Sequence, residues 1–411
     1  MNLSAIQQAD AQDPLACKRD EFALKTGQIY LDGNSLGALP KAARQRAMDV
    51  VEQQWGDDLI TSWNRHQWID LPVSVGEKIA PLIGAEAGQV ICCDSISVNL
   101  FKLLACALNM QPGRHRVISQ KDNFPTDLYM VEGISRFVGE KNCELHLVEA
   151  QHIEAALDDS VAVLMLTHVN FRSGQIHDMQ RLTRLAHQKG ILVIWDLAHS
   201  AGALPVHLDA CNVDFAVGCG YKYLNGGPGA PAFVYAAKRH HANLTQPLQG
   251  WMGHAKPFAF DHRYQPAQGM QCFLVGTPAV LSMAVLDEAL NVFDGVDMSL
   301  VRRKSVQQSE LFIQLLEASF ELGEFTLASP EDASQRGSQV SVSNHHAYAI
   351  CQALIAQGVI ADFRAPDILR FGFTPLYTSY EDVWNAAAHL RRIMTEKTYL
   401  QPAFQVKAKV T

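Results

Sequence analysis

One lysine stands where its amine could act as a nucleophile. Lys222 follows the apolar run 215–219 and lies in a glycine-rich turn, with Gly220 before it and Gly226 after it. Such a run predicts a buried strand, and glycines let the backbone bend sharply and approach a bound group closely. A poorly solvated lysine amine is more easily neutral, and neutral lysine amines form Schiff bases. Taken alone, Lys222 also fits a surface lysine in a loop.

A carboxylate lies twenty-six positions upstream of this lysine, at the end of another apolar run. Residues 191–195 are Ile-Leu-Val-Ile-Trp, and Asp196 follows them, with His199 three positions later. Pyridoxal phosphate, which forms Schiff bases with lysines, needs an acid beside its pyridine nitrogen because the protonated ring is the better electron sink. A nearby carboxylate favours that protonated form, and ligand-binding groups gather at the strand ends of α/β sheets. Together, Asp196 and Lys222 predict a pyridoxal phosphate site.

Four motifs in the chain resemble the kynureninase family. They are GNSLG at residues 33–37, FPTD at 124–127, DLAH at 196–199 and GYKYL at 220–224. The resemblance runs from about residue 30 to residue 377. It implies a pyridoxal-phosphate-dependent hydrolase of fold-type I, the aspartate aminotransferase-like group. The implied reaction of tryptophan catabolism cleaves the Cβ–Cγ bond of L-kynurenine, or 3-hydroxy-L-kynurenine, to give anthranilate, or 3-hydroxyanthranilate, and L-alanine.

The resemblance also assigns roles to single residues. Lys222 holds the cofactor and moves a proton from the substrate Cα, and Tyr221 assists proton transfer and contacts the phosphate. His199 orients the region of Asp196. The cofactor residues implied in this way are Ile96, Ser97, Phe124, Asp127, Thr167, Asp196, His199, Tyr221, Lys222, Trp251 and Thr277.

Two of these assignments have independent physical support. The stretch 94–97 (Asp-Ser-Ile-Ser) opens a predicted helix, and a helix N-terminus attracts a phosphate through its free N–H groups and its dipole. Simple N-capping by Asp94 or Ser95 is the alternative, and both roles are compatible. Phe124 follows a predicted strand, and its ring could stack on the pyridine.

The remaining cofactor residues lie later in the chain. An indole N–H such as that of Trp251 is a usable phosphate donor. The turn 275–278, which contains Thr277, reaches by resemblance into the phosphate site of a neighbouring subunit. The resemblance therefore implies a homodimer with shared active sites.

An arginine inside an apolar run predicts the place of the substrate carboxylate. Arg370 lies within 368–373 (Ile-Leu-Arg-Phe-Gly-Phe), and a buried arginine needs an anionic partner. That partner is either a structural carboxylate or the carboxylate of an amino-acid substrate, and the resemblance favours the substrate. Trp63 and Asn34 are further candidates for substrate contact, although Trp63 also fits the core.

Two other enzyme classes compete with this interpretation. Residues 33–37 match the G-x-S-x-G nucleophile elbow of serine hydrolases with Ser35 as nucleophile, but only about 30 residues precede it, too few for the earlier strands of that fold. A cysteine desulfurase would carry a nucleophilic cysteine on a mobile loop after the lysine. The loop-like stretch 329–343 contains no cysteine.

Composition excludes several kinds of partner. The chain has 411 residues, of which 48% are hydrophobic and 18% charged, with a net charge of −8 and no basic block. We therefore expect no nucleic-acid partner, and no apolar run reaches membrane-spanning length. Nine scattered cysteines without a C-x-x-C pair indicate a reducing cytoplasm. The adjacent pairs His240-His241 and His345-His346 lack metal-ligand spacing, so we expect no metal.

The order of elements predicts an α/β fold. Strands and helices alternate through residue 236, which indicates a mostly parallel central sheet flanked by helices. From about Val296 the pattern changes to a smaller α+β unit. We expect a large cofactor-binding domain at 1–295 and a small C-terminal domain at 296–411, with residues 1–40 contributing to the small domain or the substrate mouth.

Overall fold

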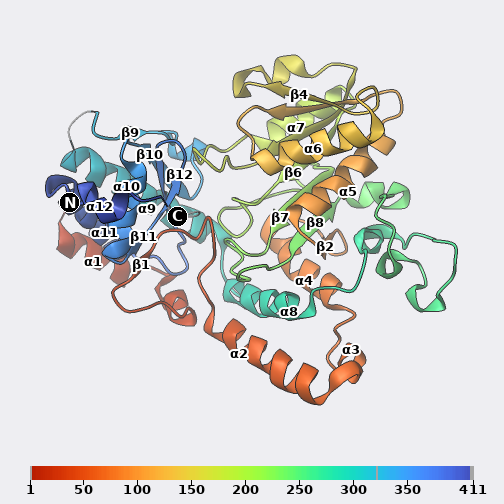
Figure 1. Ribbon diagram of the computed structural model, residues 1–411, viewed down its shortest axis with the longest axis horizontal. Coiled ribbons are helices and arrows are strands. Elements are labelled where there is room, and N and C mark those ends of the chain that lie inside the picture. Colours follow the sequence, from red (N-terminus) through yellow and green to blue (C-terminus); the bar gives the residue numbers. More distant parts are fainter. Residues whose placement is uncertain (1, 321–322, 408–411) are drawn as a thin grey trace.

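The larger part of the molecule is built on a seven-stranded sheet (Figure 1). A computed structural model describes residues 2–320 and 323–407. The sheet has the strand order β2-β8-β7-β6-β5-β3-β4. Its strands are β2 (Val90–Cys92), β3 (Arg116–Gln120), β4 (Glu144–Val148), β5 (Val161–Thr167), β6 (Leu192–Asp196), β7 (Phe215–Cys219) and β8 (Ala232–Ala236).

This sheet is mostly parallel. Strands β4, β3, β5, β6 and β7 pair in parallel, whereas β8 is antiparallel to both β7 and β2. Every residue of β5, β6, β7 and β8 is buried, because a parallel sheet is covered by helices on both faces. The sequence prediction of a mostly parallel α/β sheet is confirmed.

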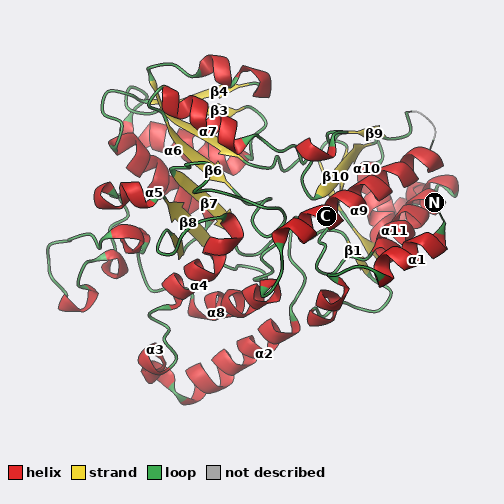
Figure 2. Cartoon of the chain, turned by 180° about the vertical axis from the view of Figure 1, so that it is seen from behind, coloured by secondary structure: helices red, strands yellow, loops and turns green. Residues whose placement is uncertain are grey.

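Helices cover both faces of the sheet and form two hydrophobic cores with it (Figure 2). On one face lie α4 (Leu71–Ile79), α7 (Met179–Gln188) and α8 (Val280–Ala289). On the other face lie α5 (Ile96–Asn109) and α6 (Pro125–Val138). The side chain of Trp195 belongs to the first core and that of its neighbour Ile194 to the second, as the alternation of a strand requires.

The smaller part contains a four-stranded antiparallel sheet of order β12-β13-β10-β9 and a third core. Its strands are β9 (Thr326–Leu327), β10 (Gln339–Ser343), β12 (Asp362–Arg364) and β13 (Ile368–Gly372). Its helices are α9 (Met298–Ser319), α10 (Ala347–Ala356), α11 (Tyr380–Thr395) and α12 (Pro402–Gln405).

The beginning of the chain lies with this smaller part. Helix α1 (Leu3–Ala11) packs on α11, and β1 (Ile29–Tyr30) pairs in parallel with β11 (Val359–Ile360). The buried side chains of Ile6 and Leu31 belong to its core. Figure 1 shows the red N-terminal segment beside the blue C-terminal elements.

An arm of helices extends below the larger part in Figure 1. It consists of α2 (Lys41–Asp49), a π-helical continuation (Val50–Asp57) and α3 (Ser62–Arg65). Large apolar side chains on and beside it are exposed, namely Leu39, Met48, Val51, Trp55, Leu59, Ile60 and, on the adjacent α8, Leu281. We call these seven residues the arm patch. Large exposed apolar side chains of this kind are candidates for an interface with another molecule.

The described residues contain no helix with the length and hydropathy of a membrane span, and no group of three or more potential metal ligands.

Candidate active site

The carboxyl ends of β5, β6 and β7 meet at one edge of the large sheet and border a cavity of about 230 Å³. Consecutive parallel strands place their ends at the same edge, and ligands bind there in open α/β sheets. Nine of the residues singled out from the sequence line this cavity: Ile96, Ser97, Phe124, Asp127, Thr167, Asp196, His199, Tyr221 and Lys222.

Lys222 enters the cavity from the turn after β7. The N–H of Gly220 donates to the carbonyl of Pro231 at 3.0 Å, and the N–H of Gly37 donates to the carbonyl of Tyr221 at 2.8 Å. A Cβ at position 37 would overlap the carbonyl oxygen of Lys222, so only glycine allows this approach. The GNSLG turn therefore supports the lysine from the side of the smaller part.

The amine of Lys222 contacts a buried histidine. Its Nζ lies 2.9 Å from Nε2 of His199. Burial, together with the charge of Lys222, holds the pKa of His199 well below its ordinary value. The ring is therefore neutral and accepts a hydrogen bond from the lysine. The rings of Phe124 and Tyr221 lie 6.0 and 5.8 Å from the same nitrogen.

Two buried carboxyl groups also line the cavity. Asp196 accepts a hydrogen bond from the N–H of Ala198 at 2.7 Å, whereas neither carboxyl oxygen of Asp127 has a hydrogen-bond partner among the described residues. Burial raises the pKa of both groups, and the charge of Asp196 raises that of Asp127 further. Unsatisfied buried oxygens are costly, and a protonated pyridine nitrogen is a donor that fits them.

The third wall of the cavity is the start of α5. Ser95 is the N-cap, and its hydroxyl accepts a hydrogen bond from the N–H of Val98 at 3.4 Å. Ile96 and Ser97 follow in the first turn, where backbone N–H groups lack intrahelical partners. This chemistry suits a phosphate, so the residues present fit pyridoxal phosphate at its aldehyde, its ring nitrogen and its phosphate.

Phe124 and Thr167 complete the lining, together with a residue that the sequence did not reveal. The ring of Phe171 lies edge-to-face on Phe124, with centroids 5.2 Å apart, and lines the cavity. Phe171 follows β5 in a turn of mostly polar residues. Its isolated aromatic ring was the feature of the sequence that could have revealed it as a site residue. The hydroxyl of Thr167 is hydrogen-bonded to the side chain of Asn123.

Arg370 is buried but already has an anionic partner. Its Nε donates to Oδ1 of Asp362 at 2.7 Å, and its Nη2 donates to Oδ2 of the same carboxylate. Nη2 also donates to the hydroxyl of Ser35 at 3.1 Å, and Nη1 donates to the carbonyl of Phe171. A guanidinium has five N–H groups, and among the described residues one N–H group on Nη1 has no hydrogen-bond partner.

The sequence argument left a structural carboxylate open as the alternative for Arg370, and the structure provides one. Strand β12 pairs with β13 so that Asp362 lies opposite Arg370, which the one-dimensional pattern could not show. Arg364 also binds Asp362, at 2.9 Å. Burial and the charge of Asp362 raise the pKa of the neighbouring Asp32 to about 7. Positive charge therefore remains in excess around Arg370 near neutral pH.

Arg370 does not line the cavity, and neither do four other residues singled out from the sequence. Asn34 is buried, with its Nδ2 3.5 Å from Oε1 of Gln339. Trp63 lies in α3 and packs edge-to-face on Trp68. Trp251 and Thr277 are exposed. Within one chain these side chains are not gathered at the site.

Ser35 does not have the surroundings of a hydrolase nucleophile. Its hydroxyl donates to Asp362 at 2.6 Å and accepts from Arg364 and Arg370. Among the described residues no histidine forms a hydrogen bond with it. The hydroxyl lacks a general base, so the serine hydrolase interpretation has no geometric support.

Solved structures with the same fold have low sequence identity to this chain. The apo structure of a cysteine desulfurase from Thermococcus onnurineus NA1 superposes with a TM-score of 0.76 at 17% identity, covering 92% of this chain and 98% of that one. A C-DES variant with glycine covalently linked to its PLP cofactor gives a TM-score of 0.75 at 18% identity, covering 91% and 98%. The fold is therefore fold-type I.

Sequence comparison is more specific. Residues 301–390 match the family model "Kynureninase C-terminal domain", and residues 90–212 match the DegT/DnrJ/EryC1/StrS aminotransferase family. Kynureninase from Burkholderia pseudomallei strain K96243 is 49% identical over 408 residues, and that from Pseudomonas fluorescens is 48% identical over 407 residues. Each comparison covers 98% of both chains. The chain belongs to the kynureninase family.

Proposed function

We propose that the protein is a pyridoxal-phosphate-dependent kynureninase. It hydrolyses L-kynurenine, or 3-hydroxy-L-kynurenine, to anthranilate, or 3-hydroxyanthranilate, and L-alanine. The observation that carries the proposal is the meeting of Lys222 and Asp196 around one cavity, at the ends of adjacent parallel strands. A chain 49% identical to kynureninase over 98% of its length supports the choice of reaction.

The cofactor is held at three points. Lys222 would bind it covalently through Nζ, Asp196 and Asp127 would hold its ring nitrogen, and the start of α5 with Ile96 and Ser97 would bind its phosphate. Phe124 would pack on the ring, with Thr167 beside it. When bound, pyridoxal phosphate supplies the electron sink that stabilises negative charge at the substrate Cα.

The residues around the amine manage protons. Neutral His199 accepts a hydrogen bond from Nζ of Lys222, so it orients the amine and stays uncharged beside it. Lys222 takes the proton from Cα and returns it later. Burial raises the pKa of the Tyr221 phenol, so its hydroxyl stays protonated and can donate a hydrogen bond during proton transfer.

Arg370 orients the substrate through its carboxylate. Asp362, Ser35 and the carbonyl of Phe171 hold the guanidinium in place. The second N–H group of Nη1 binds the substrate carboxylate. Asn34 lies in the turn beside it and shapes the substrate mouth.

The active form is a homodimer with shared sites. Trp63, Trp251 and Thr277 lie outside the cavity of their own chain and are available to a neighbouring one. The arm patch supports this arrangement, because its apolar side chains would be covered by a second copy. The chain divides at about residue 295 into a large and a small domain. Its nine cysteines are all free thiols, which supports a cytoplasmic location.

Mixing the purified protein with L-kynurenine and recording anthranilate fluorescence tests the function directly. We expect fluorescence, together with the long-wavelength absorbance of lysine-bound pyridoxal phosphate. Release of sulfur from cysteine instead would indicate a desulfurase. The absorbance band without turnover of any amino acid would indicate a protein that only binds the cofactor. Absence of the band would overturn the proposal.

A further inference from the structure

A fully buried lysine lies directly behind the proposed phosphate site. Lys102 is 0% exposed and lies on α5, the helix whose first turn contains Ile96 and Ser97. Its Nζ donates to Oδ2 of Asp94 at 2.6 Å, to the carbonyl of Phe273 at 2.7 Å and to Sγ of Cys93 at 3.6 Å. All three of its N–H groups therefore have partners. Burying an ammonium group is costly unless it is paired in this way.

On one side, Lys102 holds the turn that leads into α5. Asp94 adopts a left-handed backbone conformation with φ of 49°, which is strained for a residue with a side chain. Its carbonyl accepts the N–H of Ala232 at 2.9 Å, and Nδ2 of Asn99 donates to the carbonyl of Cys93 at 2.8 Å. The ion pair between Asp94 and Lys102 also holds the side chain of Asp94 in place. Ser95, the N-cap, is the next residue.

On the other side, Lys102 holds the segment that precedes Thr277. It binds the carbonyl of Phe273, four positions before Thr277. The carbonyl of Val275, between these two residues, accepts the N–H of Met252 at 3.3 Å. A Cβ at Gly250 would overlap the same peptide group. The segment 250–253, which contains Trp251, is thus packed on the segment that Lys102 anchors.

We propose that Lys102 is a positioning residue for the phosphate end of the cofactor site. Through Asp94 it sets the turn that presents Ile96 and Ser97, and through Phe273 it sets the segments of Trp251 and Thr277. The inference rests on the proposed function, because these segments are assigned to the cofactor phosphate. Lys102 itself does not line the cavity. Its effect is on the geometry of the groups that do.

The test compares two ligands that differ only in the phosphate. The full-length chain, freed of cofactor by dialysis, is titrated with pyridoxal phosphate and with pyridoxal. In Lys102→Met we expect the affinity for pyridoxal phosphate to fall about tenfold or more, the scale of one hydrogen bond to a charged group. The affinity for pyridoxal should stay within about twofold, because Lys222 and Asp196 are untouched.

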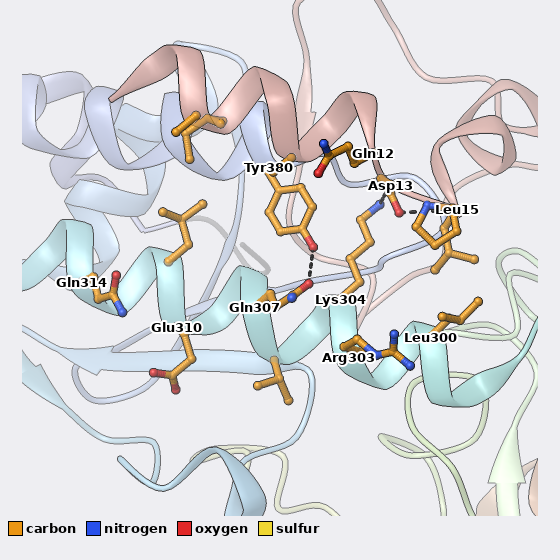
Figure 3. A pocket seen from close by; sticks show the side chains of 16 residues that line it. Gln12, Asp13, Leu15, Leu300, Arg303, Lys304, Gln307, Glu310, Gln314 and Tyr380 are labelled. Carbon is orange, nitrogen blue, oxygen red and sulfur yellow. Dashed lines mark hydrogen bonds and ion pairs between the residues drawn. The ribbon is translucent and has the colours of Figure 1, made fainter. Parts of the chain in front are cut away.

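The chain contains a matched control. Lys304 is 5% exposed, and its Nζ donates to Oδ2 of Asp13 at 2.6 Å and to the carbonyl of Pro375 at 2.6 Å. Figure 3 shows this pair between α1 and α9, beside a cavity of about 560 Å³ that is separate from the proposed active site. Like Lys102, Lys304 is buried and binds one aspartate carboxylate and one backbone carbonyl, but it lies in the smaller part. Lys304→Met should lower Tm while keeping the wild-type ratio of the two affinities.

The outcomes separate positioning from general stability. If Lys102→Met keeps the wild-type ratio of the affinities for pyridoxal phosphate and pyridoxal, as Lys304→Met should, then Lys102 is only structural and the inference is wrong. If Lys102→Met does not fold, the double variant Lys102→Met/Asp94→Asn removes both charges, and the same ratio is measured on it. Failure of wild-type protein to bind either ligand would instead overturn the proposed function.

Discussion

Nζ of Lys222 lies 2.9 Å from Nε2 of His199, and the two residues follow adjacent parallel strands. The histidine is held neutral by burial and by the lysine itself, so it accepts a hydrogen bond without adding a second positive charge. This contact joins the turn after β7 to the turn after β6. The amine of Lys222 and the carboxylate of Asp196 therefore lie at one edge of the sheet, in adjacent turns that this contact joins.

Replacing the lysine should abolish both cofactor attachment and turnover. In Lys222→Ala we expect the long-wavelength absorbance band to disappear and anthranilate production to stop, because among the described residues Lys222 is the lysine whose amine contacts His199 in the cavity. Borohydride reduction followed by peptide mapping locates the attachment site. The exposed Lys238, in the variant Lys238→Ala, is the control and should behave as wild type. A reducible cofactor bound to a different lysine in Lys222→Ala would contradict the assignment.

Removing the ring-nitrogen carboxylate should weaken cofactor binding. The contact between Asp196 and a pyridinium is a charge-assisted hydrogen bond, worth roughly 1.5–3 kcal/mol. Asp196→Ala should therefore bind pyridoxal phosphate roughly 10- to 150-fold more weakly and turn over far more slowly. Equilibrium titration of the cofactor and steady-state kinetics are the measurements. Near-normal affinity and kinetics would show that Asp196 does not face the ring nitrogen.

Replacing the arginine should affect the substrate and spare the cofactor. Arg370→Ala should lower kcat/KM for L-kynurenine by roughly 30-fold to several-thousand-fold, since losing such a pair costs on the order of 2–5 kcal/mol. Arg370→Lys should recover only part of the loss, because an ammonium cannot reproduce the fork that Asp362 holds. The absorbance band controls for cofactor loading. A normal kcat/KM in fully loaded Arg370→Ala would show that the arginine only balances Asp362.

The raised pKa of Asp32 predicts a pH-dependent stability. Burial and the charge of Asp362 raise this pKa to about 7. Between pH 4 and 7 the unfolded chain has lost the Asp32 proton while the folded chain keeps it, so this group lowers stability as pH rises and adds no slope above pH 7. The free energy of unfolding of Asp32→Asn, relative to that of wild type, should therefore rise by on the order of 2 kcal/mol from pH 5 to pH 8. Urea unfolding of both proteins at pH 5 and pH 8 checks this. The same difference in unfolding free energy between variant and wild type at both pH values would refute the prediction.

The arm patch should be required for assembly. Ile60 and Trp55 are 76% and 63% exposed in the single chain, and a charge there would be buried by a second copy. We expect Ile60→Asp to be monomeric in analytical ultracentrifugation and to lose activity, since the neighbour's Trp251 and Thr277 are lost with it. Phe137, 81% exposed on α6, offers the control Phe137→Asp, which should remain dimeric. A fully active monomer would overturn the shared site.

The sequence alone determined the parts of the site that follow from strand order. Lys222, Asp196 and Thr167 each follow a continuous apolar run, and consecutive parallel strands must end at the same edge, so their meeting in one cavity was predictable. The N-terminus of α5 was equally predictable, because its capping pattern is local. The strand β4 (Glu144–Val148) was missed because an edge strand is only partly buried and lacks a continuous apolar run.

Tertiary structure decided every contact between residues far apart in the chain. Asp362 lies opposite Arg370 because β12 and β13 are antiparallel in that register, and the choice between a structural and a substrate carboxylate depended on this pairing. Lys102 meets Phe273, 171 positions away, only because α5 and the later segment pack on the same face of the sheet. Periodicity and local motifs report which face of an element is buried. They do not report which partner buries it.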